Sequence, residues 1–379
     1  MSQITRREFL KMGTGAAFML GTSIVLSSCK SDHNVLGPAD INATVSIISG
    51  NNLDHMTRDA IEAIGGIGSI VNEGETVFIK PNFVTFPWAS TNNCFSNGEV
   101  TKTEIIIAVT EECLKVGAAE VIIGEGSHLP TFDWNYATTL DQSTDLVTAA
   151  ENLTLKYNGK VTLACLEVDS PEWVEVPSRT YLEKIAIYSM VSRADRIISI
   201  PVAKTHSWAE LTLGLKNFIG ITPLERYGTW VNDSHWDRGY HLDHSSPEAI
   251  AQIYLDIVDA IKPDLTIVDF SIGIEGDGPT VGSGGLKVNM KERLGSWVVL
   301  ASTDIMAADA TTARIMSYNV PNVKQLRMGY DMGLGEIREE SIEIVGERIE
   351  NVRVDWLVAN LRNKVLPHRL EDITIGQYL

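Results

Sequence analysis

Short β-branched apolar runs alternate along the chain with longer segments in which apolar residues recur every three or four positions. The short runs are typical of strands, and the longer segments are typical of amphipathic helices. The alternation predicts an α/β fold with a mixed, largely parallel sheet flanked by helices. Strands are predicted at 44–48, 76–80, 120–124, 161–168, 196–202, 265–270 and 297–302, and helices at 56–71, 105–116, 146–155, 247–261 and 305–317.

Two further local patterns refine this picture. Thr101 and Glu104 have the spacing of a capping box ahead of the helix at 105–116. No internal repeat and no sharp change of composition divides the chain after residue 42. We therefore expect residues 43–379 to form one elaborated α/β domain, with a two-lobed version as the alternative.

The N-terminus has the pattern of an export signal. Arg6, Arg7 and Lys11 precede a mildly apolar stretch that ends at Leu26-Ser-Ser-Cys29. The stretch is too short and too polar for a membrane span, so residues 1–28 are predicted to be a signal peptide and 29–42 a tether. The paired arginines resemble a twin-arginine signal, and Leu-Ser-Ser-Cys resembles a bacterial lipobox. We expect the export machinery as a partner, and a lipid anchor at Cys29 on the periplasmic or cell-surface side of a bacterial membrane.

Charge and cysteine content exclude several classes of function. The chain has 31 Lys and Arg against 49 Asp and Glu, a formal charge of −18, which argues against nucleic-acid binding. After Cys29 the cysteines are Cys94, Cys113 and Cys165. Three thiols cannot supply the four ligands of an iron–sulfur cluster, so no such cluster is expected from the chain's own cysteines.

Polar residues follow five of the predicted strands. In open α/β sheets, ligands bind beyond the carboxyl ends of the strands, so these residues predict a shared pocket. They lie in Lys80-Pro-Asn82, Gly124-Glu-Gly-Ser-His128, Lys204-Thr-His206, Glu275-Gly-Asp-Gly-Pro279 and Ser302-Thr-Asp304.

The segment from Lys204 to Gly220 is the richest in candidate chemistry. If 208–218 is helical, Thr212 and Lys216 share a face, with Asn217 beside them. Lysine, histidine and asparagine on an apolar framework suit a carboxylate or a phosphate. The alternative is that Lys216 and Asn217 cap a helix C-terminus ahead of Gly220.

A second cluster, 232–244, contains three histidines and three aspartates, which are potential ligands for a divalent metal. Its spacing matches no standard metal motif, and the alternative is a polar surface loop. Glycines at 273–285 would let an anion approach the backbone N–H groups closely. However, the P-loop, the dinucleotide fingerprint and Gly-x-Ser-x-Gly are all missing from the sequence.

From about residue 75 to 347 the sequence resembles the bacterial and archaeal family called domain of unknown function 362. The resemblance rests on Ile79–Asn82, Ala194–Ile198, Lys204–His206, Thr212, Lys216, Asn217, Gly220, His241, Asp269, Glu275–Pro279, Ser302–Asp304 and Asp309. It implies no general activity. Some members add a ferredoxin-like cluster domain, whose cysteines this sequence lacks. A fainter similarity to nickel-pincer lactate racemases implies interconversion of 2-hydroxy acids by proton or hydride transfer.

Our first hypothesis is an exported enzyme that acts on a small anionic substrate. Its candidate catalytic residues are Lys204 and a general base, either His206 or His241. The candidate substrate-binding residues are Lys80, Asn82, Thr212, Lys216, Asn217, Glu275, Gly276 and Gly278. Asp304 and Asp309, with His241, are candidate ligands for a divalent metal. The alternatives are a non-catalytic lipoprotein that binds a solute or redox partner, and a purely structural role for these residues.

Overall fold

The computed structural model describes residues 41–178, 183–231, 234–238, 242 and 246–359. Its centre is an 11-stranded sheet in which neighbouring strands run in the order β15-β1-β14-β12-β7-β2-β3-β4, with β8, β9 and β13 joined through β12. The strands are β1 (Ala43–Gly50), β2 (Thr76–Pro81), β3 (Glu120–Glu125), β4 (Lys160–Cys165), β5 (Trp173–Pro177), β6 (Lys184–Tyr188), β7 (Arg196–Ile200), β8 (Val202–His206), β9 (Glu210–Thr212), β10 (Thr229–Val231), β11 (His235–Asp237), β12 (Leu265–Gly276), β13 (Gly285–Asn289), β14 (Trp297–Ser302) and β15 (Ile342–Gly346).

The half of the sheet formed by β7, β2, β3 and β4 is parallel, whereas β14 runs antiparallel to both β1 and β12. The predicted fold class, a mixed and mostly parallel sheet flanked by helices, is confirmed. The helices are α2 (Leu53–Ala63), α3 (Thr103–Lys115), α4 (Leu146–Lys156), α5 (Leu166–Asp169), α6 (Ser189–Arg193), α7 (Leu224–Tyr227), α8 (Pro247–Ile261), α9 (Met290–Leu294), α10 (Ile305–Ile315), α11 (Lys324–Asp331) and α12 (Ile349–Val352).

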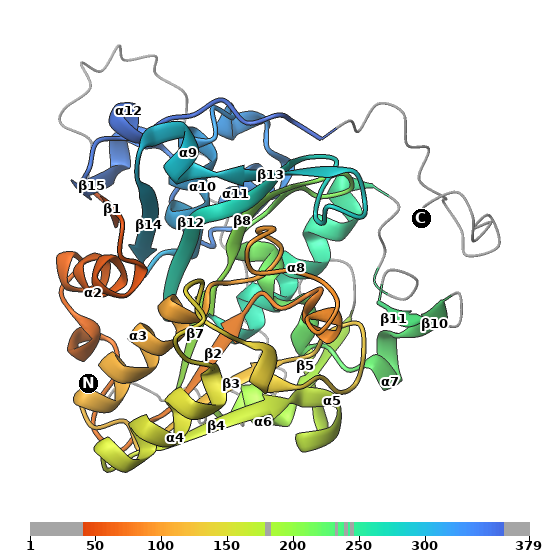
Figure 1. The fold of residues 1–379 in the computed structure, drawn as a ribbon. Coiled ribbons are helices and arrows are strands. Elements are labelled where there is room, and N and C mark those ends of the chain that lie inside the picture. The colour runs from red at the N-terminus through yellow and green to blue at the C-terminus, as the bar shows by residue number, and fades with distance from the viewer. Residues whose placement is uncertain (1–40, 179–182, 232–233, 239–241, 243–245, 360–379) are drawn as a thin grey trace, which may run out of the picture.

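Helices cover both faces of the sheet (Figure 1). In β2, Val77 and Ile79 belong to the apolar cluster under α2, α3 and α4, whereas Phe78 points into the cluster under α8 and α10. The same alternation recurs in β3 and β7 because successive side chains of a strand point to opposite faces. Burial on both faces accounts for the nearly unbroken apolar runs in the sequence.

Three local expectations differ from the structure. Segment 208–218 is not a helix: a turn follows β8, β9 pairs back on it, and the 3₁₀ helix η4 (Leu215–Ile221) comes after. Glu210 enters β9 with a φ of 63°, a left-handed conformation that stops a helix from continuing there. The strand expected at 196–202 is divided at Pro201 into β7 and β8, because proline has no N–H for the ladder.

The capping box is the third difference. Helix α3 begins at Thr103 with no side-chain cap, and the Glu104 carboxylate accepts from the N–H of Leu140 instead. The hydroxyl of Thr101 accepts from the N–H of Asn82 at 2.9 Å and donates to the carbonyl of Ile200 at 2.6 Å. Thr101 therefore holds the ends of β2 and β7 together rather than capping a helix.

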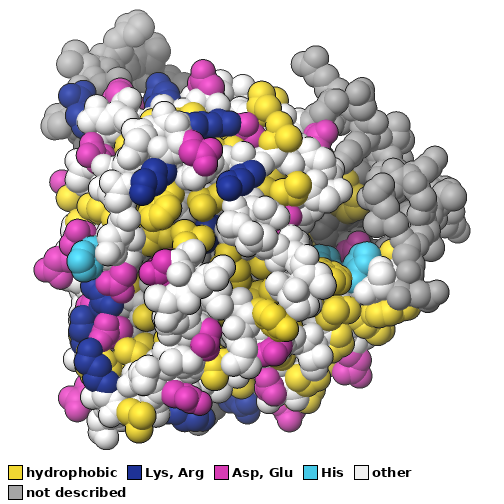
Figure 2. Space-filling view, viewed as in Figure 1, with side chains coloured by type: hydrophobic (Ala, Val, Ile, Leu, Met, Phe, Trp, Pro, Cys, Tyr) yellow, Lys and Arg dark blue, Asp and Glu magenta, His cyan; other side chains and the backbone are white. Residues whose placement is uncertain are grey.

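In the described part of the chain, every helix is too short or too polar to serve as a transmembrane span. Cys94, Cys113 and Cys165 are buried free thiols. The predicted signal peptide, Cys29 and most of the tether lie outside the described residues, and the predicted domain boundaries stay predictions. On the face seen in Figure 2, acidic and basic side chains are interspersed.

Candidate functional site

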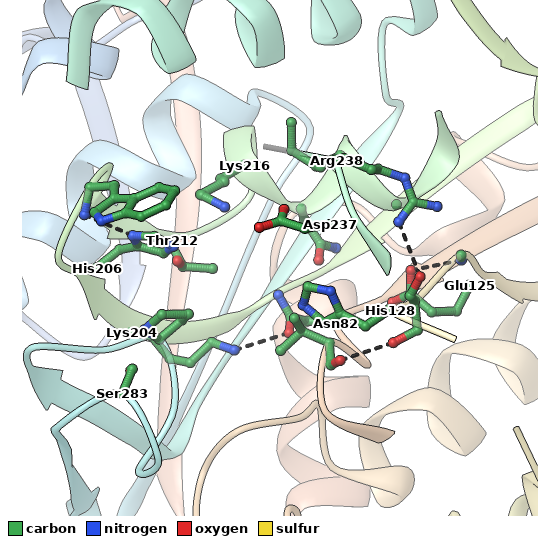
Figure 3. A pocket seen from close by; sticks show the side chains of 18 of the residues that line it. Asn82, Glu125, His128, Lys204, His206, Thr212, Lys216, Asp237, Arg238 and Ser283 are labelled. Carbon is green, nitrogen blue, oxygen red and sulfur yellow. Dashed lines mark hydrogen bonds between the residues drawn. The ribbon is translucent and has the colours of Figure 1, made fainter. Parts of the chain in front are cut away.

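A pocket of about 500 Å³ opens at the carboxyl ends of β2, β3 and β8, beside η4. Thr212, which is the cross-strand partner of Lys204, contributes from β9. Figure 3 shows side chains from these separate elements around one cavity. Seven predicted site residues line it, namely Lys80, Asn82, Lys204, His206, Thr212, Lys216 and Asn217.

Lys204 is a fully buried cation at the centre of this group. Its ammonium donates to the side-chain oxygen of Asn82 at 3.0 Å and to the carbonyl of Glu99 at 2.7 Å (Figure 3). The Glu99 carboxylate is occupied elsewhere, since it accepts from the N–H of Val281 and the amide of Asn92. Burial, together with the neighbouring Lys216 and Lys102, lowers the pKa of Lys204 to about 7, although Glu99 opposes this. Among the described residues, no carboxylate forms an ion pair with Lys204.

Lys80 and Arg238 are cations of the same wall, but both are paired. The Lys80 ammonium lies 2.5 Å from a Glu125 oxygen. Arg238 donates to the carbonyls of Thr222 and Ser127 and forms a 2.5 Å ion pair with Glu167. These pairs fix the pocket wall, whereas Lys204 brings a charge that its own neighbours do not neutralise.

Two side-chain oxygens of the lining residues lack hydrogen-bond partners among the described residues. The buried hydroxyl oxygen of Thr212 and the buried carbonyl oxygen of the Asn217 amide have no hydrogen bond within the described residues. The Asn217 nitrogen donates to the carbonyl of Lys80 at 2.8 Å, and Asn217 is among the residues that line the pocket. Lys216 is half-buried, and burial lowers the pKa of its amine to about 8 against the opposing charge of Asp237. Unpaired buried polar atoms cost about 1–3 kcal/mol each, which a ligand would recover.

The two pocket histidines present opposite ring nitrogens. Nδ1 of His206 accepts from the backbone N–H groups of Trp208 at 3.0 Å and Ala209 at 3.3 Å, which puts the ring proton on Nε2. Nδ1 of His128 lies 2.8 Å from the carbonyl oxygen of Trp236, to which it can only donate. Neutral His128 therefore carries its lone pair on Nε2, and burial lowers its pKa below the ordinary 6.5. In the neutral rings, Nε2 is therefore an acceptor in His128 and carries the proton in His206.

Of the other predicted binding residues, Glu275, Gly276 and Gly278 do not line the pocket. The Glu275 carboxylate pairs with Arg293 at 2.5 Å and accepts from the N–H of Leu357. Gly276 accepts from the Thr205 hydroxyl, and the carbonyl of Gly278 accepts from the N–H of Ser207. These contacts hold the glycine-rich loop against β8, and the loop brings Asp277, Pro279 and Ser283 to the cavity instead.

Asp304 and Asp309 also lie outside the pocket lining. Asp304 caps α10 through the N–H groups of Met306 and Ala307. Asp309 accepts from the N–H groups of Gly214 at 2.8 Å and Leu215 at 2.9 Å, so it holds the start of η4. Their oxygens are thus occupied by backbone donors rather than aimed at a common point. Within the described residues, no three His, Cys, Asp or Glu side chains gather as metal ligands would.

His241, the preferred histidine of the sequence, lies outside the described residues, so its proposed roles stay predictions. The candidate catalytic, binding and metal residues did not include Glu125, Ser127, His128, Trp208, Asp237, Arg238, Asp277 and Ser283, all of which line the pocket. Four of these, Glu125, Ser127, His128 and Asp277, lie in strand-end segments that the sequence predicts to share a pocket, but they were given no role. The signal for His128 was present, because it follows a buried strand as Lys80 does. Asp237 and Arg238 were read only as part of a metal cluster or surface loop.

These features define an α/β protein with a polar, partly unneutralised pocket at its strand ends. The chain belongs to the family described as Domain of unknown function (DUF362), which matches residues 77–314. The family predicted from the sequence is confirmed. The chain is similar to the thylakoid-associated protein sll1697 of Synechocystis sp. (strain PCC 6803), with 24% identity over 287 residues that cover 75% of this chain and 76% of that protein.

Two solved structures are also similar. The lactate racemase apoprotein of Thermoanaerobacterium thermosaccharolyticum aligns with a TM-score of 0.34 and 11% identity, over 69% of this chain and 55% of that one. A protein from Thermotoga maritima aligns with a TM-score of 0.33 and 12% identity, over 64% of this chain and 56% of that one. This chain spans little more than half the length of either solved chain.

Proposed function

We propose that the protein is an enzyme that binds a small carboxylate or phosphate and moves a proton on it. The observation that carries this proposal is Lys204, an ammonium buried to 0 % exposure whose hydrogen-bond acceptors are neutral oxygens. Buried charges are costly unless they are paired, so an anionic ligand is the missing partner. The Thr212 hydroxyl and the Asn217 oxygen, which have no hydrogen bond among the described residues, and Lys216 in the same lining support a ligand with several polar groups.

His128 is the general base of this proposal, in place of His206 or His241. A base needs a free lone pair, and Nε2 of neutral His128 has one, whereas the lone pair of His206 is on Nδ1 and already engaged by two backbone N–H groups. The lowered pKa keeps His128 neutral at pH 7.

The test separates binding from proton transfer. Lactate, pyruvate and their phosphorylated relatives are titrated by calorimetry, and deuterium uptake from heavy water into each compound is followed by NMR. Lys204→Met should weaken anion binding at least tenfold, while the surface variant Lys287→Met should not. His128→Asn, which retains a donor for the carbonyl of Trp236, should keep the affinity and lose at least about a hundredfold in exchange rate. Anion binding without any exchange by the wild type would instead favour the non-catalytic solute-binding protein.

We also propose that the chain is exported through the twin-arginine route and anchored by a lipid at Cys29. Arg6, Arg7 and the Leu-Ser-Ser-Cys29 sequence support this, and the relative named above is described as thylakoid-associated, a description that accords with membrane attachment. Cys29→Ala should move the protein from the membrane fraction to the soluble fraction, and Arg6→Lys with Arg7→Lys should hold it in the cytoplasm. Membrane association unchanged in Cys29→Ala would contradict the lipid anchor.

A further inference from the structure

The Lys216 amine differs from the other pocket cations. The ammonium groups of Lys80 and Lys204 are each held by hydrogen bonds, whereas that of Lys216 has no hydrogen bond or ion pair among the residues that the structure describes. It nevertheless lines the cavity and is half-buried. An amine that is only partly solvated and is not paired with a carboxylate can act as a nucleophile when it is neutral.

The surroundings of Lys216 suit a reaction at a carbonyl group. Figure 3 shows its amino end directed into the cavity, near the side chain of Asp237. Thr212 and Asn217 line the same cavity, and their buried side-chain oxygens have no hydrogen bond among the described residues. Lys204 lines the same cavity of about 500 Å³ as Lys216.

We infer that Lys216 forms an imine with the carbonyl carbon of a small 2-oxo acid whose carboxylate pairs with Lys204. This inference rests on the proposed function, since it uses the same anion site and the same base. It specifies the substrate class, namely acids that have a carbonyl group next to the carboxylate. It also gives Lys216 a covalent role that anion binding alone does not require.

The steps balance without an oxidant or a second substrate. The neutral amine attacks the carbonyl carbon, so a C–N bond forms, the second C–O bond breaks, and one proton passes from nitrogen to that oxygen. The resulting hydroxyl takes a second proton from solvent and leaves as water, while the nitrogen lone pair forms the C=N bond of a protonated imine. Nε2 of His128 then takes a proton from the carbon on the far side of the imine, and the C–H electron pair moves toward nitrogen to form an enamine. Return of a proton and of water releases the 2-oxo acid.

The electrostatics permit this division of roles once the carboxylate is bound. The pKa of Lys204 is lowered to about 7, below that of Lys216, and an anionic carboxylate beside Lys204 would raise its pKa and keep it charged. Burial lowers the pKa of Lys216 to about 8, which leaves a usable neutral fraction near pH 7 to 8, whereas an exposed lysine has almost none. Asp237 on β11 acts in the opposite direction and favours the protonated form. Its charge would stabilise the positively charged imine that follows.

Reductive trapping tests the inference. Full-length protein is incubated with pyruvate and cyanoborohydride, and the modified lysine is located by peptide mass spectrometry. Lys216 should be labelled at least tenfold more than the exposed Lys287, and Lys216→Arg should abolish the label. Lys204→Met should reduce it, because the carboxylate loses its partner. Equal labelling of many lysines, or labelling of Lys204 alone, would overturn the inference.

Two further measurements separate this inference from the proposed function. Calorimetry shows whether pyruvate binds, and NMR shows whether its methyl protons exchange with heavy water. Binding and exchange that persist in Lys216→Arg, with no trapped adduct in the wild type, would overturn the imine and leave the proton-transfer enzyme standing. No binding of any anion would overturn both. The melting temperature of Lys216→Arg should stay near that of the wild type, which shows that a lost label reflects the amine.

Discussion

The carboxylate of Asp309 accepts a hydrogen bond from the N–H of Gly214, and a Cβ placed on Gly214 would lie 2.8 Å from the same oxygen. A buried carboxylate on α10 thus holds, through hydrogen bonds, the backbone just before Lys216 and Asn217. The absence of a side chain at 214 is what permits the approach. Asp309 is a positioning residue for the pocket, although it touches none of it.

Asp309→Asn should therefore weaken anion binding without removing any pocket group. An amide can accept from one of the two N–H groups but turns an NH₂ toward the other, so η4 loses one buried hydrogen bond, worth about 1–3 kcal/mol. Calorimetry with pyruvate or phosphate measures the effect, and Asp331→Asn on the exposed side of α11 is the matched control. Equal affinity in Asp309→Asn and wild type would show that η4 does not depend on this contact.

The same residue predicts a pH dependence of stability. Burial raises the pKa of Asp309 from 3.8 to about 7 in the folded protein, so between these values the folded state keeps a proton that the unfolded state has lost. This group therefore lowers the free energy of unfolding as pH rises from about 4 to about 7. Urea unfolding at several pH values should show wild type losing stability relative to Asp309→Asn across that window. Parallel curves for the two proteins would contradict the prediction.

Gly126 and Gly220 bring the end of β3 against η4. A Cβ at Gly126 would overlap the carbonyl oxygen of Gly220, and a Cβ at Gly220 would overlap Glu125. Gly126→Ala should destabilise the protein by about 1–3 kcal/mol and open the pocket wall. Gly282→Ala is the control, since its Cβ would meet nothing closer than 3.7 Å. Chemical unfolding of the three proteins decides whether the close approach is required.

Anion affinity should fall as pH rises above about 7. Lys204 and Lys216 have pKa values lowered to about 7 and about 8, so the pocket loses positive charge in this range. The affinity should drop by up to about tenfold per pH unit if one lysine must be protonated. Lys204→Arg should flatten this decline because a guanidinium stays charged. A decline of the same steepness in Lys204→Arg would place the responsible proton elsewhere.

The two pocket histidines should give opposite tautomers in NMR. Two-bond ¹H–¹⁵N correlations of the neutral rings should show Nδ1 protonated in His128 and Nε2 protonated in His206, because of the backbone partners of each ring. His128→Asn and His206→Asn assign the signals. The same tautomer in both rings would remove the distinction between base and donor.

Much of the architecture was accessible from the sequence because strand and helix periodicities are local. Short, nearly unbroken apolar runs located the strands that became β2, β3 and β14, and the strand-end rule found Lys80, Lys204 and His206. The helix expected at 208–218 is wrong. Over so short a segment, the apolar residues of a helix and those of a short hairpin follow similar patterns, so the pattern alone does not distinguish the two structures. The left-handed φ of Glu210 and the antiparallel pairing of β9 with β8 make this segment a hairpin.

What the sequence by itself determined is therefore the α/β class, the family and the kinds of residue that stand at the strand ends. Tertiary structure decided which of those ends meet. Glu275 forms an ion pair with Arg293, and Asp309 accepts hydrogen bonds from backbone N–H groups, so neither lines the pocket. His128 does line it. It also decided which ring nitrogen carries the proton in each pocket histidine, and which lysine has no ion pair among the described residues. The physical reason is that hydrogen-bond partners and burial come from residues far apart in the chain, and no local pattern records them.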